Sequence, residues 1–346
     1  MKIIILTEGG EEIGFGHVTR CISLSQAFAA RKHSTRFIVA GDASVAEVLK
    51  TNHCEIFDWK KEEKLLMQAI AGADVALVDS YLADENIYKK ISAAAKVAVF
   101  LDDTNRLDYP PGLVVNWSIG ARDLHYPEKD DVFYLLGPGY ISLRNAFRKV
   151  PVKEIKETIT DVLVTFGGDD SKNLTPGVLQ FLTRHYPTLQ KHIVIGGAFK
   201  NRPEIQAAAD SHTHLVDSPD DEGMKEIMIQ SDIAIASGGQ TLYELARVGV
   251  PAVVIAVADN QQHNVAGWEK TGFIENAGSW QDEHLMDVVA DRFRELSTLE
   301  SRRRATAAGY NIVPGSEAER IVKRIEERLD VYKQNNPKTK SKKKTK

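Results

Sequence analysis

The chain has 346 residues, of which 43% are hydrophobic and 27% are charged, which is ordinary for a globular protein and long enough for two domains. Of its 44 basic residues, six are lysines within the last 13 positions, so the rest of the chain carries 38 basic residues against 48 acidic ones. This acidic body argues against a protein that binds nucleic acid. We expect residues 334–346 to form a disordered basic tail, either simply solvated or weakly attracted to RNA or anionic lipid.

Cysteine usage and the apolar runs indicate the setting of the protein. Cys21 and Cys54 form no Cys-x-x-Cys pair, and no cluster of metal ligands accompanies them. This predicts a reducing, cytoplasmic setting and no bound metal. The first ten residues, "MKIIILTEGG", do not resemble a signal peptide, because glycines and acids follow the short apolar run at once. No segment reaches the ~18 apolar residues needed to span a membrane.

The N-terminal half alternates apolar runs of strand length with helical patterns. The predicted strands are 2–6, 34–41, 75–80, 96–103 and 113–118, and the predicted helices are 17–32, 43–52, 62–71 and 84–95. Continuous apolar strands that alternate with helices predict a parallel sheet in a doubly wound α/β domain. We place this domain at residues 1–148.

The same pattern restarts after a charged segment at 146–158. The predicted strands are 161–168, 192–197, 212–217, 233–239 and 251–257, and the predicted helices are 174–185, 221–230, 240–248, 260–271, 281–307 and 315–333. We place the second domain at residues 158–333, with the last helix able to pack back on the first domain. The chain is therefore predicted to have two Rossmann-like doubly wound domains, with a cleft between them and ligands at the carboxyl ends of the strands.

The first glycine-rich turn is "EGGEEIGFGHVTRC", residues 8–21. It is no Walker A motif, and it is a poor dinucleotide fingerprint because Thr19 stands where the third glycine is needed after Gly14 and Gly16. A strand, a glycine turn and a helix N-terminus still make an anion site. The helix N-terminus disfavours an imidazolium, so His17 is expected to be neutral and able to act as a base. The alternative is that His17 only caps the helix or packs.

The segment "IASGGQTLYELARVGVP", residues 235–251, has the same strand-to-helix form. Gly238 and Gly239 would let a phosphate approach the backbone where a helix begins at Gln240 or Thr241. Glu244 lies one turn into that helix, from which its carboxylate could reach ribose hydroxyls. The alternative is a surface glutamate on an amphipathic helix.

Other strand ends bring polar residues to the same edges. Asp79 and Tyr81 follow one strand of the first domain, and the adjacent pair Asp102 and Asp103 follows another. That pair could hold Mg²⁺, although capping of the backbone is the preferred interpretation. In the second domain, "FGGDDS" contains Gly168 before two aspartates that could be helix caps. The polar residues after residue 257 are Asn260, Gln261, His263 and Asn264, which either bind a ligand or begin an exposed helix.

The series G-x-G-H-x-x-R-C at 14–21, "FGGDD", "SGGQTLYEL" and "ADNQ" resembles the GT-B-type glycosyltransferase superfamily, and in particular its UDP-sugar hydrolases of pseudaminic acid biosynthesis. The resemblance runs in order over roughly residues 1–330. "GFGHVTRC", which includes Arg20, and "SGGQTLYEL" are its most specific parts.

The resemblance implies that the second domain binds UDP, with the pyrophosphate at Gly238 and Gly239 and the ribose at Glu244. It implies that the sugar faces the first domain, with His17 as the base for water. Tyr81 matches a family tyrosine on the sugar side. Asn260 matches a family asparagine, and Arg144 matches a family arginine near the domain junction.

The chain departs from the family pattern at the start of the first loop. The family has an arginine and then an acid two residues apart, whereas here Leu6 stands at the arginine position and Glu8 at the acid. This departure bears on which sugar is bound and leaves the expected UDP site unchanged. The patterns specify neither the sugar nor an oligomeric state, and they assign no role to Glu8, Glu11 or Glu12.

The function expected from the resemblance is hydrolysis of a UDP-amino sugar by water at the anomeric carbon, with inversion and without a cofactor. A glycosyltransferase of the same fold, which would need an acceptor, is the first alternative, although no apolar and basic membrane patch for a lipid acceptor is evident in residues 1–150. The second alternative is a non-catalytic protein that binds nucleotide sugars. A dinucleotide oxidoreductase is disfavoured by the missing third glycine.

Overall fold

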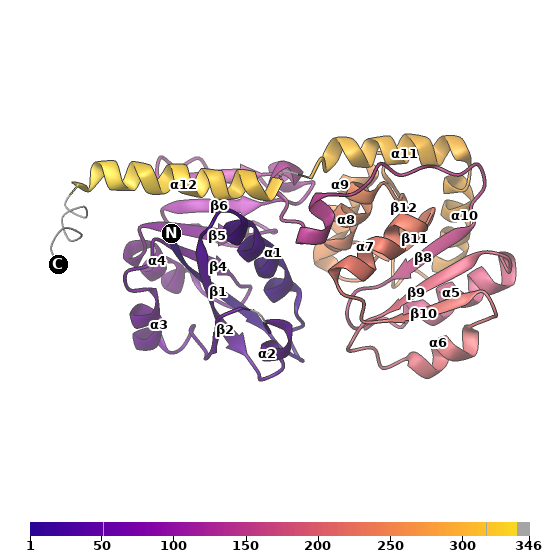
Figure 1. Cartoon of the computed structure of the whole chain (residues 1–346), viewed down its shortest axis with the longest axis horizontal. Coiled ribbons are helices and arrows are strands. Elements are labelled where there is room, and N and C mark those ends of the chain that lie inside the picture. Colours follow the sequence, from indigo (N-terminus) through magenta and orange to yellow (C-terminus); the bar gives the residue numbers. More distant parts are fainter. Residues whose placement is uncertain (51, 316, 338–346) are drawn as a thin grey trace. The chain divides into compact units, whose positions relative to one another are not determined.

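The computed structural model describes residues 1–50, 52–315 and 317–337. The chain forms two compact units, each described here by itself (Figure 1). Unit 1 comprises Met1–Arg144 together with the C-terminal helix, and unit 2 comprises Asn145–Gly315. Both units are α/β, with a parallel sheet covered by helices, as predicted.

Over the described residues, the strands of unit 1 pair in the order β3-β2-β1-β4-β5-β6-β7, and every pairing is parallel. The strands are β1 (Lys2–Gly9), β2 (Ser34–Gly41), β3 (Cys54–Ile56), β4 (Val75–Asp79), β5 (Val97–Leu101), β6 (Gly112–Asn116) and β7 (Val132–Leu136). The helices are α1 (Gly16–Ala30), α2 (Val45–Val48), α3 (Glu63–Ile70), α4 (Glu85–Ala94) and α12 (Glu317–Asn335), with short 3₁₀ turns at Ala121–Leu124 and at Pro138–Tyr140 (η2). The strand order reverses between β1 and β4, so the carboxyl ends of these two strands flank the topological switch point, where such sheets bind ligands.

The C-terminal helix α12 belongs to unit 1, where it contacts α1, β5 and η2 (Figure 1). Arg31 Nε donates to Glu326 Oε1 at 3.0 Å, and His33 Nε2 lies 2.8 Å from the same oxygen. The predicted tail begins inside this helix, because Gln334 and Asn335 are its last residues. Residues 338–346 lie outside the described residues.

Over the described residues, the strands of unit 2 pair in the order β10-β9-β8-β11-β12-β13, again all parallel. The strands are β8 (Asp161–Thr165), β9 (Gln190–Ile195), β10 (Thr213–Asp217), β11 (Ile233–Ser237), β12 (Ala252–Ala256) and β13 (Ile274–Ser279). The helices are α5 (Leu174–His185), α6 (Arg202–Ala208), α7 (Asp221–Gln230), α8 (Thr241–Val248), α9 (Asp259–Glu269), α10 (Leu285–Leu296) and α11 (Leu299–Ile312). The switch point lies between β8 and β11.

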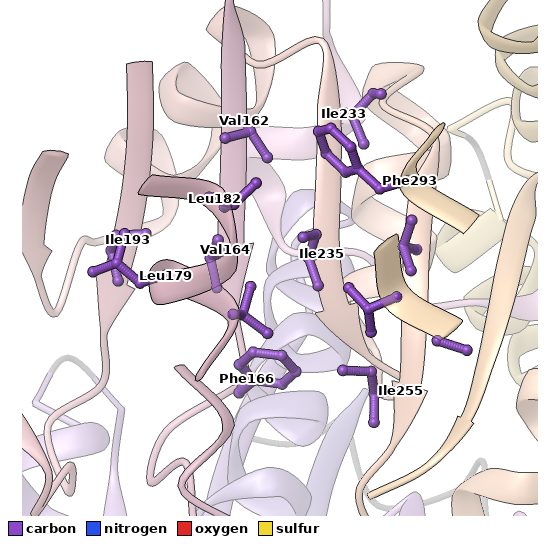
Figure 2. Close-up of a cluster of buried hydrophobic side chains, with 14 of the residues drawn as sticks. Val162, Val164, Phe166, Leu179, Leu182, Ile193, Ile233, Ile235, Ile255 and Phe293 are labelled. Atoms are coloured by element: carbon purple, nitrogen blue, oxygen red, sulfur yellow. The ribbon is translucent and has the colours of Figure 1, made fainter. Parts of the chain in front are cut away.

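The core of unit 2 follows from the alternation of side chains along β8 and β11. Ile233 and Ile235 of β11 point to one face, where they meet Leu182 of α5 and Phe293 of α10 (Figure 2). These side chains are fully buried. Removal of their apolar surface from water stabilises the sheet and holds its carboxyl edge in place.

Two segments differ from the prediction. A local helix cap explains the first difference, and long-range hydrogen bonds explain the second. The predicted helix 281–307 is two helices, because the Thr298 side chain caps α11 by accepting a hydrogen bond from Ser301 N–H at 3.1 Å. The charged segment 146–158, which separates the two predicted domains, belongs to unit 2. Arg247 Nε donates to the Phe147 carbonyl at 3.1 Å, and the buried Arg302 donates to the Lys156 carbonyl at 2.8 Å.

Candidate active site

A small backbone bridge closes the loop from β1 to α1. Gly14 N–H donates to the Gly10 carbonyl at 2.8 Å, and Gly10 N–H donates back to the Gly14 carbonyl at 3.3 Å. Gly14 has a φ of +83°, a conformation that favours glycine. Beyond the bridge, α1 begins at Gly16, so His17 lies in its first turn, where backbone N–H groups have no partner within the helix. The space where a Cβ would stand on Gly14 or Gly16 is open.

His17 lies against Asp79, the last residue of the neighbouring strand β4. Its Nδ1 is 2.8 Å from Oδ1 of Asp79. Asp79 is fully buried and His17 is 8% exposed. The sheet order explains the contact, because β1 leads into α1 and pairs directly with β4. Two residues that are 62 positions apart therefore meet at the switch point.

Arg20, one turn further along α1, completes a buried ion pair with Asp79. Arg20 Nε donates to Asp79 Oδ2 at 2.5 Å, and Nη2 donates to Oδ1 in a short hydrogen bond. Burial alone would raise the pKa of the Asp79 carboxyl, but the charge of Arg20 and the contact with His17 outweigh it and hold that pKa well below its usual range. Asp79 is therefore an anion that accepts hydrogen bonds.

This charge state decides the tautomer of His17. An ionised carboxylate only accepts, so the proton of the imidazole lies on Nδ1 and is donated to Asp79. Arg20 Nη2 is 2.9 Å from Nδ1, but its hydrogen bond goes to Asp79 Oδ1 for the same reason. The Nε2 atom then keeps its lone pair and can accept a proton. This arrangement, in which a carboxylate orients a base, recurs in hydrolytic enzymes.

Tyr81 covers one side of the imidazole. The two rings meet edge to face with their centroids 4.5 Å apart. The Tyr81 hydroxyl donates to Asp103 Oδ2 in a short hydrogen bond, and Arg20 Nη1 donates to the same oxygen at 3.1 Å. Tyr81 is 37% exposed, so it is the most accessible member of this group, whereas Asp79 has no exposed surface.

Glu8 joins the group from the end of β1. It is 1% exposed, and its Oε1 is 3.9 Å from Nε2 of His17. Sequence reasoning assigned no role to Glu8 and gave Asp103 only a capping or Mg²⁺ role. Their positions in the sequence could have indicated a role for both residues. Each lies close to the carboxyl end of a strand that is a neighbour of β4 in the sheet.

In unit 2, the two glycines after β11 have different surroundings. A Cβ on Gly238 would lie 2.4 Å from Cγ2 of Val265 on α9, whereas no atom lies within 4 Å of a Cβ on Gly239. Gly238 N–H donates to Gln261 Oε1 at 3.1 Å, and the Gly238 carbonyl accepts from Asn264 Nδ2 at 2.9 Å. Gly238 therefore packs against α9, and the open backbone begins at Gly239.

The polar residues predicted at the start of α9 also differ in their surroundings, because some bond within the protein and others are exposed. Gln261 Oε1 also accepts from Val257 N–H at 3.1 Å, so this oxygen joins the ends of β11 and β12. Asn260 and His263 are exposed at the start of α9. The amide oxygen of Gln261 is thus engaged within the protein, and Asn260 and His263 are the accessible pair.

Glu244 lies in the first turn of α8 and is 3% exposed. It is buried, unlike the surface glutamate that was the alternative interpretation. Gln240 and Thr241 are half-buried at the start of the same helix. This helix N-terminus follows the open Gly239 and lies at the switch point of unit 2.

The remaining predicted residues are Arg144 and the group that follows β8. Gly168 is exposed in the turn after β8, and Arg144 is half-buried as the last residue of the first segment of unit 1. Asp170 caps α5, because its side chain accepts from the N–H groups of Leu174 and Thr175, both at 3.0 Å. This agrees with the capping interpretation.

Asp102 and Asp103 have separate partners. Asp102 accepts from Asn105 N–H at 2.9 Å and so closes its own turn, while Asp103 contacts Arg20 and Tyr81. Over residues 1–50, 52–315 and 317–337, no group of three or more His, Cys, Asp or Glu side chains is arranged to hold a metal ion. Within those same ranges, no helix combines the length and apolar character that crossing a membrane requires.

No protein-family model matches the chain. It is 28% identical over 271 residues to an uncharacterized protein of Methanocaldococcus jannaschii, covering 74% of this chain and 55% of that one. It is 24% identical to the UDP-2,4-diacetamido-2,4,6-trideoxy-β-L-altropyranose hydrolase of Campylobacter jejuni, and the match covers 79% of this chain and 98% of the hydrolase. A Helicobacter pylori protein named as both pseudaminic acid cytidylyltransferase and the same hydrolase is 25% identical, covering 75% and 45%.

The predicted resemblance to these hydrolases is confirmed. The chain spans about half the length of the relatives from M. jannaschii and H. pylori and nearly the whole of the C. jejuni hydrolase. Among solved structures, MurG of Acinetobacter baumannii has a TM-score of 0.66 at 14% identity, covering 94% of this chain and all of that one. UGT2 of Phytolacca americana has a TM-score of 0.67 at 10% identity, covering 95% and 100%. The fold is that of the GT-B glycosyltransferases.

Proposed function

We propose that this protein hydrolyses a UDP-activated amino sugar at its anomeric C1–O bond and releases UDP and the free sugar with inversion, in the biosynthesis of a nonulosonic acid of the pseudaminic type. The observation on which this rests most is the pair His17–Asp79. Asp79 holds the imidazole at 2.8 Å with Nε2 left as the acceptor, at the switch point of unit 1. The names of the C. jejuni and H. pylori relatives support the choice of substrate and reaction.

Unit 2 would hold the nucleotide. The N–H groups at Gly239, Gln240 and Thr241 precede or open α8, and a helix N-terminus attracts the negative charge of a pyrophosphate. We assign Glu244, one turn further, to accept hydrogen bonds from the ribose. The amide of Gly238 is already bonded to Gln261, so the proposed contact begins at Gly239.

Unit 1 would supply the chemistry at the sugar. Water oxygen forms the new bond to C1 while its proton passes to Nε2 of His17. The C1–O bond to UDP breaks, and its electron pair leaves on the phosphate oxygen. Because backbone amides and the helix dipole stabilise that charge, the leaving group needs no carboxylic acid to protonate it, unlike the leaving group of ordinary glycosidases. Direct displacement by water inverts the anomeric centre.

The buried residues around His17 would act through it, and the accessible ones would touch the sugar. Asp79 has no exposed surface, so we assign it to orient His17 rather than to bind substrate. Tyr81 is exposed beside the imidazole and is our candidate for sugar contact. Arg20 would keep Asp79 ionised.

A panel of UDP-sugars incubated with the protein, without any acceptor, tests this function. We expect release of UDP together with free sugar, and ¹H NMR at early times should show the anomer opposite to that of the substrate. The fold is also that of glycosyltransferases, for which UDP release would require an acceptor. Release only on addition of an acceptor would favour a transferase, and binding without any release would favour a non-catalytic sensor.

The two glycines of unit 2 offer a matched test of the nucleotide site. Gly239→Ala adds a methyl group to open space, so we expect normal thermal stability but UDP affinity lower by about tenfold, or ~1.4 kcal/mol. Gly238→Ala would press against Val265 and lower the free energy of unfolding by ~1–3 kcal/mol. Calorimetric titration with UDP and thermal unfolding measure the two effects. Unchanged UDP affinity in Gly239→Ala would exclude a phosphate contact there.

A further inference from the structure

Glu8 is a carboxylate held rigidly at the edge of the sheet. Its Oε2 accepts from the Ser80 hydroxyl at 2.5 Å, and its Oε1 accepts from Tyr81 N–H at 2.7 Å. Lys60 Nζ is 3.9 Å from Oε2. Both hydrogen bonds are donated to the carboxylate, so Glu8 acts as an acceptor in this setting.

The fixed carboxylate faces the free nitrogen of His17. The Oε1 atom of Glu8 is 3.9 Å from Nε2, while Asp79 is bonded to Nδ1 on the other side of the ring. With the proton on Nδ1, Nε2 and Oε1 are both acceptors, and neither can bond to the other directly. Oε1 already accepts from Tyr81 N–H, but a carboxylate oxygen has a second lone pair and can accept again. A donor with two protons, placed between Oε1 and Nε2, can therefore serve both atoms.

One water molecule satisfies this pair of acceptors. At hydrogen-bond lengths of about 2.8 Å, a single oxygen reaches two points 3.9 Å apart with an angle of roughly 90° between its two bonds. That angle is close to the angle between the O–H bonds of water. A water that donates both protons in this way directs its lone pairs away from the protein groups.

We propose that Glu8 is a second catalytic residue, which with His17 holds and orients the attacking water. This inference rests on the proposed hydrolysis. The water gives one proton to Nε2 of His17 as its oxygen bonds to C1, and it keeps the other proton, hydrogen-bonded to Oε1 of Glu8, in the hydroxyl of the product. The positive charge that forms on His17 is then flanked by the carboxylates of Glu8 and Asp79.

Two substitutions separate the charge of Glu8 from its role as an acceptor. Glu8→Gln keeps an oxygen that can accept from Tyr81 N–H and from water but removes the charge, so we expect kcat to fall about tenfold. Glu8→Met removes the acceptor as well, and kcat should fall by ~10²–10³. In both variants KM and the affinity for UDP should stay near the wild-type values. Glu12→Gln, which removes an exposed charge from the same loop, is the matched control and should keep the wild-type kcat.

Azide distinguishes a role in handling water from a structural role. Azide is an anionic nucleophile that needs no base and no second acceptor, so it should restore UDP release in Glu8→Met and give the glycosyl azide. Thermal unfolding and UDP titration confirm that the variant is folded. If Glu8→Met does not fold, Glu8→Gln decides, through its kcat at unchanged KM.

The inference fails if the wild type hydrolyses a UDP-sugar and a folded Glu8→Met keeps kcat within about threefold. It also fails if kcat is lost but azide restores nothing. Both outcomes differ from failure of the proposed function, in which the wild type itself releases no UDP from any UDP-sugar without an acceptor.

Discussion

We expect His17→Asn to remove turnover and to leave UDP binding intact. The asparagine side chain can still bond to Asp79, but it offers no atom that takes a proton from water. We expect kcat to fall by ~10²–10⁴, the usual contribution of a positioned general base. Steady-state kinetics with the UDP-sugar identified by the panel measures kcat, and calorimetry measures UDP affinity, which should not change because the proposed nucleotide contacts are all in unit 2.

His33→Asn is the matched control for this substitution. His33 also lies in unit 1, but it bonds to Glu326 of α12 rather than to the residues at the switch point. The same chemical change should therefore leave kcat at the wild-type value. A His17→Asn protein with near-normal kcat would exclude His17 as the base.

Asp79→Asn should reduce both activity and stability. An amide at this position cannot both accept from His17 Nδ1 and pair with the charge of Arg20, so the imidazole loses its fixed tautomer. Arg20 loses the fully buried one of its two anionic partners and keeps only the partly exposed Asp103. Breaking such a buried pair costs ~3–5 kcal/mol of unfolding free energy. We also expect kcat to fall at least ~10²-fold because His17 is no longer oriented. Chemical denaturation and steady-state kinetics measure the two effects.

The stability effect of Asp79 has a definite pH dependence. The folded pKa of Asp79 is depressed, with burial opposed and outweighed by Arg20 and His17. Its contribution is therefore complete above the unfolded value of about 3.9 and is lost as pH falls below that value. The difference in unfolding free energy between wild type and Asp79→Asn should be constant near neutrality and shrink under acid conditions.

Asp74→Asn provides the control for Asp79→Asn. Asp74 directly precedes β4, at the opposite end of the strand, where it pairs with Lys96 at 2.6 Å in a partly exposed position. We expect a loss of less than ~1 kcal/mol and no change in kcat. A loss as large as that of Asp79→Asn would contradict the assignment of a special role to the buried pair.

Most of the doubly wound architecture could be predicted from the sequence, because strands that are buried on both faces of a parallel sheet consist of continuous apolar runs. The prediction missed short strands such as β3 (Cys54–Ile56) and the irregular edge strand β13 (Ile274–Ser279), which carry no such run. It also extended one helix through Thr298, whose side chain starts a new helix. Caps of this kind can be recognised in a sequence, but here the helical pattern continues on both sides of Thr298, so the break between the two helices was not predicted.

For the site, the sequence identified the residue types at strand ends but could not say which strands are neighbours. His17 and Asp79 were both singled out, yet their contact depends on the pairing of β1 with β4. Glu8 needed the same information, because its partners Ser80 and Tyr81 follow β4. In unit 2, the hydrogen bond from Gly238 N–H to Gln261 is likewise a tertiary contact, and no local sequence motif predicts it.

Hydrolysis in H₂¹⁸O tests the central claim most directly. If His17 activates water for attack at C1, a single turnover should place ¹⁸O in the anomeric hydroxyl of the free sugar and none in UDP. Mass spectrometry of both products at early times, before the free sugar exchanges its anomeric oxygen with solvent, reads the position of the label. Label in the β-phosphate of UDP would mean cleavage of the O–P bond and would contradict the account.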